Sequence, residues 1–334
     1  MKVPLIATVN HRTIDLRTGK LKVKVFRNST TEAVESPYEP YFYIQGPKMS
    51  NPYKSIASDK ELHLTKQKYI PMKDTLPPTA MFDGGREALL ERLCIEHPEF
   101  FYQFPNTDDL KCLVFDIETH SPDGGFPFGE KYPVVAIGVV TSSGEREVFL
   151  WDGENDRKVL LDFAAYVNDY DPDIMCGYNL VGYDIPQILH RAKFNGLSGY
   201  KKILNRDNSN WGWETPKDQK ELKMNAGGRI ILDLLRWTRL DYSLSGTPRG
   251  LKPVSRSFGL EPLELDFEEK DLLDYSMEEI NDYVLSDVDC TMYLYNHYFP
   301  QIQYIAEILC VPLATYTNAP ASYITKILQG RALF

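Results

Sequence analysis

The sequence is short of positive charge. Its 37 Lys and Arg residues are outnumbered by 47 Asp and Glu residues, which gives a net charge of −10. A protein with this balance has no global field that attracts nucleic acid. Any site for a polyanion must therefore be local, or built around metal ions.

Several other patterns are missing. The five cysteines are scattered without a C-x-x-C pair, which argues against both a zinc site and a disulfide framework. The longest apolar runs, such as residues 134–140, are far too short to span a membrane, and the N-terminal residues lack the pattern of a signal peptide. We expect a cytoplasmic, nucleoid-associated protein with no membrane partner.

A chain of 334 residues is too long for one ordinary domain and suggests two. Residues 1–109 predict a smaller β-rich domain, in which 21–26 alternate as a strand does. Residues 110–300 predict an α/β domain, a mixed sheet with flanking helices. Its expected strands are 111–119, 134–141, 147–151, 173–178 and 229–235, and its expected helices are 155–170, 185–194 and 278–298. Two more helical patterns, 301–309 and 322–333, follow.

Two carboxylates end the first strand of this domain. Period-two alternation places Leu113, Phe115 and Ile117 on one face and Asp116 and Glu118 on the other. Like charges that share a face of a strand fit for burial repel each other and resist desolvation. The pair therefore requires a cation or a proton nearby.

Two further acids stand at the edges of predicted helices. Asp287 lies within the apolar stripe of helix 278–298, where the usual explanation is a satisfied structural acid, and Tyr283 precedes it by one turn on the same face. Asp184 follows a strand at the start of a helix, where capping is a sufficient explanation. Asn179 is a turn former or a hydrogen-bonding group for a substrate.

Taken together, these acids favour a metal site. One strand end and two helices supply Asp116, Glu118, Asp184 and Asp287. Four carboxylates are enough to hold two hard divalent cations, Mg²⁺ or Mn²⁺, at the separation of about 4 Å found in two-metal hydrolases of phosphodiesters.

Three segments carry a resemblance to a known family. Residues 115–119 (FDIET), 178–184 (YNLVGYD) and 283–287 (YVLSD) resemble, in order, the three exonuclease motifs of family-B DNA polymerases, the DEDDy proofreading pattern. Segments 229–235 and 250–260 also resemble that domain, and residues 40–43 (PYFY) resemble part of the family's N-terminal domain. Tyr183 stands where the family more often has Phe, a change that keeps an aromatic ring.

The resemblance implies a ribonuclease-H-like fold and a role for each matching residue. Asp116, Glu118, Asp184 and Asp287 would hold two metal ions, Tyr283 would orient the attacking water, and Thr119, Asn179 and Tyr183 would contact the unpaired 3′ end. The expected activity is 3′–5′ hydrolysis of single-stranded DNA ends to nucleoside monophosphates, as in proofreading.

The expected partners are a primer 3′ end and a polymerase palm–fingers–thumb region, toward which residues 301–334 would form a helical connection. The sequence has neither the D-x-x-S-L-Y-P nor the Y-x-D-T-D palm motif, so we expect no polymerisation from this chain alone. Two alternatives stay open: a stand-alone exonuclease for DNA or RNA, and a non-catalytic DNA-binding or scaffold module. The polar insertion 196–228, with Lys201, Lys202, Trp211 and Trp213, is either a solvated loop or a nucleic-acid contact.

Overall fold

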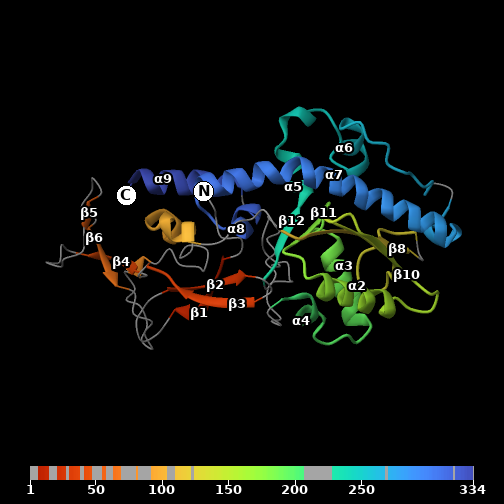
Figure 1. Ribbon diagram of the computed structural model, residues 1–334, viewed down its shortest axis with the longest axis horizontal. Helices are drawn as coiled ribbons and strands as arrows, with labels where there is room; N and C mark the ends of the chain where they lie inside the picture. The colour runs from red at the N-terminus through yellow and green to blue at the C-terminus, as the bar shows by residue number, and fades with distance from the viewer. Residues whose placement is uncertain are drawn as a thin grey trace. The chain divides into compact units, whose positions relative to one another are not determined.

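The computed structural model describes residues 7–14, 21–27, 30–37, 41–46, 55–57, 63–68, 80–81, 92–103, 110–121, 124–206, 228–267, 270–318 and 320–333 (Figure 1). The chain divides into two compact units. The first consists of Met1–Thr107, Ala306–Pro312 and Pro320–Phe334, and the second of Asp108–Ile305 and Leu313–Ala319.

The first unit is rich in β-structure. An antiparallel three-stranded sheet has the order β1-β2-β3, and a four-stranded sheet has the order β5-β6-β4-β7. The strands are β1 (Ala7–Ile14), β2 (Leu21–Arg27), β3 (Thr30–Glu35), β4 (Tyr41–Gly46), β5 (Ser55–Ala57), β6 (His63–Lys68) and β7 (Ala80–Met81), followed by the 3₁₀ helix η1 (Pro98–Gln103). Helix α9 (Pro320–Leu333) joins this unit, where the Arg331 guanidinium donates to the carbonyls of Cys94 and Leu309.

The second unit is built on a five-stranded mixed sheet of order β10-β9-β8-β11-β12. Its strands are β8 (Cys112–Thr119), β9 (Val134–Thr141), β10 (Arg146–Leu150), β11 (Ile174–Gly177) and β12 (Ile230–Asp233). Strands β8, β9 and β10 form an antiparallel meander, whereas β11 runs parallel to both β8 and β12. The mixed sheet with flanking helices confirms the predicted ribonuclease-H-like α/β class.

Each face of the sheet is covered by helices. Leu113, Phe115 and Ile117 belong to the core that β8 forms with α2 (Arg157–Tyr170), α3 (Asp184–Phe194) and α4 (Tyr200–Leu204). On the other face, Val135 and Ala136 pack with residues of α7 (Met277–Leu309). Figure 1 shows α7 crossing the sheet on the side away from α2 and α3. The alternation predicted for the first strand is therefore confirmed.

Helix α7 corrects one prediction. The sequence indicated two helices separated near Pro300, but one helix of 33 residues continues through that proline. Phe299 and Ile302 are buried on either side of it, and this burial offsets the hydrogen bond that proline cannot donate. A capping box starts the helix: Ser276 N–H donates to the Glu279 carboxylate at 2.8 Å, and Glu279 N–H donates to Ser276 Oγ at 3.2 Å.

Several short helices were not predicted. They are α4 within the expected insertion, α5 (Leu234–Leu240), η2 (Tyr242–Leu244), α6 (Leu251–Ser257), η3 (Leu272–Asp274) and α8 (Leu313–Asn318). The strand expected over 229–235 was too long, because it ends at Asp233, whose side chain accepts the N–H of Leu235 and so starts α5.

Two arginines close the base of the predicted insertion. Arg206 and Arg229 both pair with Asp171 Oδ1, at 2.8 and 2.9 Å, and Arg206 Nη1 also donates to the carbonyl of Gly228 at 3.2 Å. Residues 207–227 between them, including Trp211 and Trp213, lie outside the described residues, whereas Lys201 and Lys202 lie on α4.

Candidate active site

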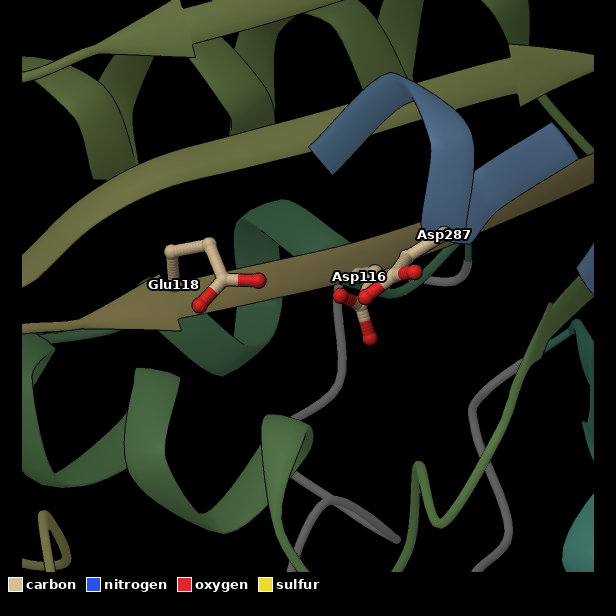
Figure 2. Close-up of side chains that lie close together, drawn as sticks. All are labelled: Asp116, Glu118 and Asp287. Atoms are coloured by element: carbon tan, nitrogen blue, oxygen red, sulfur yellow. The ribbon is translucent and has the colours of Figure 1, made fainter. Parts of the chain in front are cut away.

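Three of the predicted acids meet above the sheet. One carboxylate oxygen each of Asp116, Glu118 and Asp287 lies within 4.8 Å of the others. Figure 2 shows Asp287 reaching from α7 to Asp116 on β8, with Glu118 farther along the same strand. The structure therefore brings together side chains that are about 170 residues apart in sequence.

A glycine makes this approach possible. Gly138 of β9 lies opposite Asp116 in the strand register. A Cβ atom at this position would lie 2.9 Å from the Val284 side chain of α7, which is closer than side-chain atoms pack. Because Val284 and Asp287 are three residues apart on the helix, the absent side chain lets α7 come close enough for Asp287 to reach Asp116.

Asp184 lies beside this group but is not among its three members. It is 2% exposed at the start of α3. Burial raises the pKa of Asp184 to about 7, and the backbone N–H groups of Asp184 itself and of Ile117 counteract this rise. Ile117 separates Asp116 from Glu118, and the Asp184 charge raises the pKa of both neighbouring acids. The fourth acid thus approaches the cluster from the α3 side.

The electrostatics of the cluster favour a proton or a cation. Burial, followed by the charges of Asp184, Glu118 and Asp287, raises the pKa of Asp116 well above its ordinary value. Burial and the Asp287 charge raise the pKa of Glu118 to about 8, and burial raises that of Asp287 to about 6. Near neutral pH these carboxyls gain from any positive charge placed between them.

One oxygen of the cluster lacks a hydrogen bond. Asp287 Oδ1 is shielded from solvent and has no hydrogen-bond partner, and its nearest cation, Lys252 Nζ, is 3.5 Å away. A shielded carboxylate oxygen without a partner is costly unless it has a ligand. Oxygen ligands from several carboxylates suit Mg²⁺ and Mn²⁺. The residues present therefore fit a hard divalent cation.

Lys252 is a site residue that the sequence did not reveal. Its Nζ atom donates to the carbonyl of Leu263 at 2.6 Å and lies 3.8 Å from the centre of the Tyr283 ring. Its charge lowers the pKa values of Asp116, Glu118 and Asp287. Lys252 lies on α6, in a segment rich in Ser, Gly and Pro that shows no helical periodicity. Only the resemblance of segment 250–260 to the exonuclease domain pointed to this region.

Tyr283 lies within electrostatic reach of the acids. The side chain is 8% exposed, and burial together with the charges of Glu118, Asp287 and Asp116 raises its pKa. The half-exposed ring of Phe267 meets the Tyr283 ring edge-on at 5.9 Å. The tyrosine is thus held between Phe267 and Lys252, next to the carboxylates.

The predicted substrate residues Thr119 and Tyr183 contact each other. The Thr119 and Tyr183 hydroxyls are 2.6 Å apart, and Tyr183 also donates to the carbonyl of Pro127 at 2.8 Å. Burial raises the pKa of Tyr183 to about 12. Phe126, 75% exposed, packs edge-on against the Tyr183 ring, so an aromatic surface borders the end of β8 that carries the acids.

Asn179 stands on a turn that Asp233 holds in place. Asn179 has a positive φ of 65°, and its carbonyl accepts the N–H groups of Gly182 and Tyr183. The Asp233 carboxylate accepts the N–H of Asn179 at 2.9 Å and that of Val181 at 3.1 Å. The exposed Asn179 side chain therefore belongs to a fixed turn that leads directly into Asp184.

Comparison with known proteins identifies this domain. Residues 144–254 match the family model described as "DNA polymerase family B, exonuclease domain". The chain is 25% identical over 256 residues to the DNA polymerase delta catalytic subunit of Candida albicans, covering 64% of this chain and 23% of that protein. It is 27% identical over 222 residues to a DNA polymerase of Archaeoglobus fulgidus, covering 65% and 26% respectively. The matched segment is similar to the exonuclease domain of family-B DNA polymerases.

A solved structure agrees with the fold of this chain. The family B DNA polymerase of Pyrobaculum calidifontis superimposes with a TM-score of 0.68 at 19% identity, over all of this chain and 50% of that one. The chain thus spans half the length of that structure and about a quarter of the two curated relatives. Asp184 and Lys252 fall within the matched segment 144–254, whereas Asp116, Glu118 and Asp287 lie on either side of it.

Proposed function

We propose that this chain is a 3′–5′ exonuclease that removes nucleotides from single-stranded DNA ends as the proofreading part of a family-B polymerase. The observation that carries the proposal is the convergence of Asp116, Glu118 and Asp287, with oxygens within 4.8 Å, in a domain that matches this exonuclease family. The products would be nucleoside monophosphates.

Two divalent cations, Mg²⁺ or Mn²⁺, would be held by Asp116, Glu118, Asp184 and Asp287. When bound, such ions activate water and stabilise the charge that develops on a phosphodiester. The partly exposed Asp116 and Glu118 would contribute from β8, Asp287 from α7 and Asp184 from the start of α3. Raised pKa values mean that these carboxyls exchange protons for metal readily near neutral pH.

The remaining residues would place the substrate. The Tyr283 hydroxyl would orient the attacking water, because its ring is fixed between Phe267 and Lys252 beside the acids. Lys252 would supply a positive charge at the scissile phosphate. Thr119, Asn179 and Tyr183 would hold the unpaired 3′ nucleotide, Thr119 and Tyr183 through hydroxyls that already share a hydrogen bond.

The direct test is hydrolysis of a 5′-labelled single strand by the purified protein with Mg²⁺ or Mn²⁺. We expect a ladder that shortens from the 3′ end, and loss of activity by a factor of at least about 100 in Asp116→Ala. Asp162→Ala, which removes an exposed acid of α2 paired with Lys158, is the matched control and should keep wild-type activity. An unshortened strand, or an active Asp116→Ala protein, would refute the proposal.

Two comparisons separate the proposed function from other functions of the same acids. Rates on matched DNA and RNA strands test the substrate class, since the 2′-hydroxyl is the main difference that the site can read. Thermal unfolding with and without Mn²⁺ tests metal binding, because an ion that binds only the folded state must raise the unfolding midpoint. A midpoint that Mn²⁺ leaves unchanged would favour a scaffold over an enzyme.

A further inference from the structure

Two arginines of the second unit have no carboxylate partner and, unlike Arg157, which donates to the carbonyl of Asn195, no side-chain hydrogen bond among the described residues. Neither Arg239 nor Arg249 forms an ion pair with any carboxylate in the part of the chain that the structure describes. Five other arginines of this unit have a carboxylate partner: Arg146, Arg191, Arg206, Arg229 and Arg256. In a chain of net charge −10, a cation without a carboxylate partner calls for an explanation.

Arg249 adds a second sign of a missing ligand. Its Nη1 atom is shielded from solvent and has no hydrogen-bond acceptor among the described residues. A shielded donor of a charged group that is left without an acceptor is destabilising. Such an atom marks a place where an anionic oxygen atom would relieve the cost.

Tyr178 lies near both arginines. The Tyr178 hydroxyl donates to the carbonyl of Arg249 at 2.7 Å and shares a hydrogen bond of 3.1 Å with Thr238, the neighbour of Arg239. Burial raises the pKa of this tyrosine, and the positive charges of Arg249 and Arg239 both oppose that rise. Both guanidinium groups therefore lie within electrostatic reach of one hydroxyl.

The location of this group links it to the acids. Tyr178 follows the end of β11 and precedes Asn179, so it lies at the sheet edge where the parallel strands β8 and β11 end. Arg249 stands immediately before Gly250, the N-cap residue of α6, and the same helix carries Lys252, whose Nζ atom lies 3.5 Å from Asp287 Oδ1. Arg249 thus precedes by three residues the lysine that lies beside the acidic cluster.

An exposed aromatic residue stands on the same segment. Tyr242 is 94% exposed at the start of η2, three residues after Arg239. Arginines that bind phosphates and aromatic rings that stack on bases are the two elements of single-stranded nucleic-acid surfaces. The combination of Arg239, Arg249 and Tyr242 matches this chemistry.

We propose that Arg239 and Arg249 bind phosphates of the single strand that leads to the acidic cluster, with Tyr242 as a stacking surface for one of its bases. The ligand is the phosphodiester backbone of single-stranded nucleic acid, and its identity rests on the proposed exonuclease function. This surface differs from the predicted insertion 196–228, whose described arginine, Arg206, is occupied by Asp171 and Asp173.

The test measures binding without hydrolysis. Binding of a 5′-fluorescein-labelled oligothymidine strand is followed by anisotropy in EDTA over a series of salt concentrations. Arg239→Gln and Arg249→Gln should each raise Kd by about threefold or more and reduce the slope of log K against log salt by about 0.7. Tyr242→Ala should raise Kd by about fivefold or more with an unchanged slope, since stacking involves no counterion release.

Two matched variants make the outcome decisive. Arg157→Gln changes an exposed arginine of α2 that donates to the carbonyl of Asn195, and should bind as wild type does. Arg249→Lys keeps the charge and should keep the salt slope even if Arg249→Gln fails to fold. Wild-type binding and slope in Arg239→Gln and in a folded Arg249→Gln, a lost salt slope in Arg249→Lys, or an equal loss in Arg157→Gln would overturn the proposal.

Hydrolysis and binding, measured on the same protein, distinguish the exonuclease proposal from the phosphate-binding proposal. If Mg²⁺ or Mn²⁺ elicits no hydrolysis but binding depends on Arg239 and Arg249, the exonuclease function fails and the phosphate surface stands. If the wild-type protein degrades the strand while both glutamine variants bind and degrade it unchanged, the phosphate surface fails and the exonuclease function stands.

Discussion

The side-chain amide of Gln187 pairs with both backbone groups of Gly129. Its Oε1 atom accepts the Gly129 N–H at 2.7 Å, and its Nε2 atom donates to the Gly129 carbonyl at 3.2 Å and to that of Tyr132 at 2.6 Å. Gln187 is 0% exposed on α3. It lies one turn after Tyr183, whose hydroxyl donates to the carbonyl of Pro127. One face of α3 therefore fixes the loop that carries Phe126 beside the acidic cluster.

Replacing this amide tests how the loop is held. Gln187→Leu removes the hydrogen bonds to Gly129 and Tyr132 and should lower the free energy of unfolding by about 1–3 kcal/mol, measured by urea denaturation. If the strand contacts this loop, KM for the single strand should rise more than kcat falls. Asn168→Ala, which removes one bond within α2, should change stability by about 0.5 kcal/mol or less. Equal stability of the Gln187 and Asn168 variants would show that the amide does not hold the loop.

Gly138 should be intolerant of a methyl group. In Gly138→Ala the new Cβ meets Val284 and forces α7 away from β9, which should cost about 1–3 kcal/mol and draw Asp287 away from Asp116. The thermal shift produced by Mn²⁺ should therefore shrink. Adding Val284→Ala should restore part of the lost stability and part of the Mn²⁺-induced thermal shift, because the two substitutions affect the same contact. Additive losses in the double variant would contradict this explanation.

Metal-free stability should fall as pH rises. Glu118 has a pKa of about 8 and Asp184 one of about 7, both above the value of about 4 that carboxyls have in an unfolded chain. Between these values the folded state binds more protons than the unfolded state, so the unfolding free energy decreases with pH. The midpoint in EDTA should drop from pH 5.5 to pH 8.5, and the stabilisation by Mn²⁺ should grow over the same range. A double Asp116→Asn, Glu118→Gln variant should flatten both trends; a wild-type midpoint that rises with pH in EDTA would refute the assignment.

Lys252 should stabilise the cluster most when its acids are charged. Lys252→Met removes the cation nearest Asp287, and in metal-free protein it should cost about 1–3 kcal/mol at pH 8 and less at pH 5.5. Lys193→Met is the matched control, because that lysine is 78% exposed in a surface pair with Glu130 and should contribute about 1 kcal/mol or less. A loss that is the same at both pH values would mean that Lys252 acts by packing rather than by charge.

The features that the sequence predicted are local. Alternation alone placed Asp116 and Glu118 on one face of β8, and the helical period placed Tyr283 and Asp287 on one face of α7. Both patterns are set by neighbours a few residues away. The mixed sheet followed from the order of such elements, and the resemblance to the exonuclease motifs supplied the expectation that they converge.

The features that the sequence did not predict depend on tertiary contact. Lys252 reaches Asp287 across 35 residues of chain, and no spacing on α6 signals that contact. The sequence places Asp233 inside the expected strand 229–235. In the structure its carboxylate ends β12, because it accepts the N–H groups of Leu235 and of Asn179. The need for Gly138 appears only once Val284 is packed against it. Such residues are recognised from what they touch.

The hydrogen bond between Arg206 and the carbonyl of Gly228 has a consequence for how this fold can vary. Both ends of segment 207–227 meet at one place, held by Asp171, so the sheet does not depend on the length of chain between them. Doubling the length of a loop whose ends are already joined costs only about 0.6 kcal/mol. A foreign peptide inserted between Arg206 and Gly228 should therefore have little effect on the stability of the sheet.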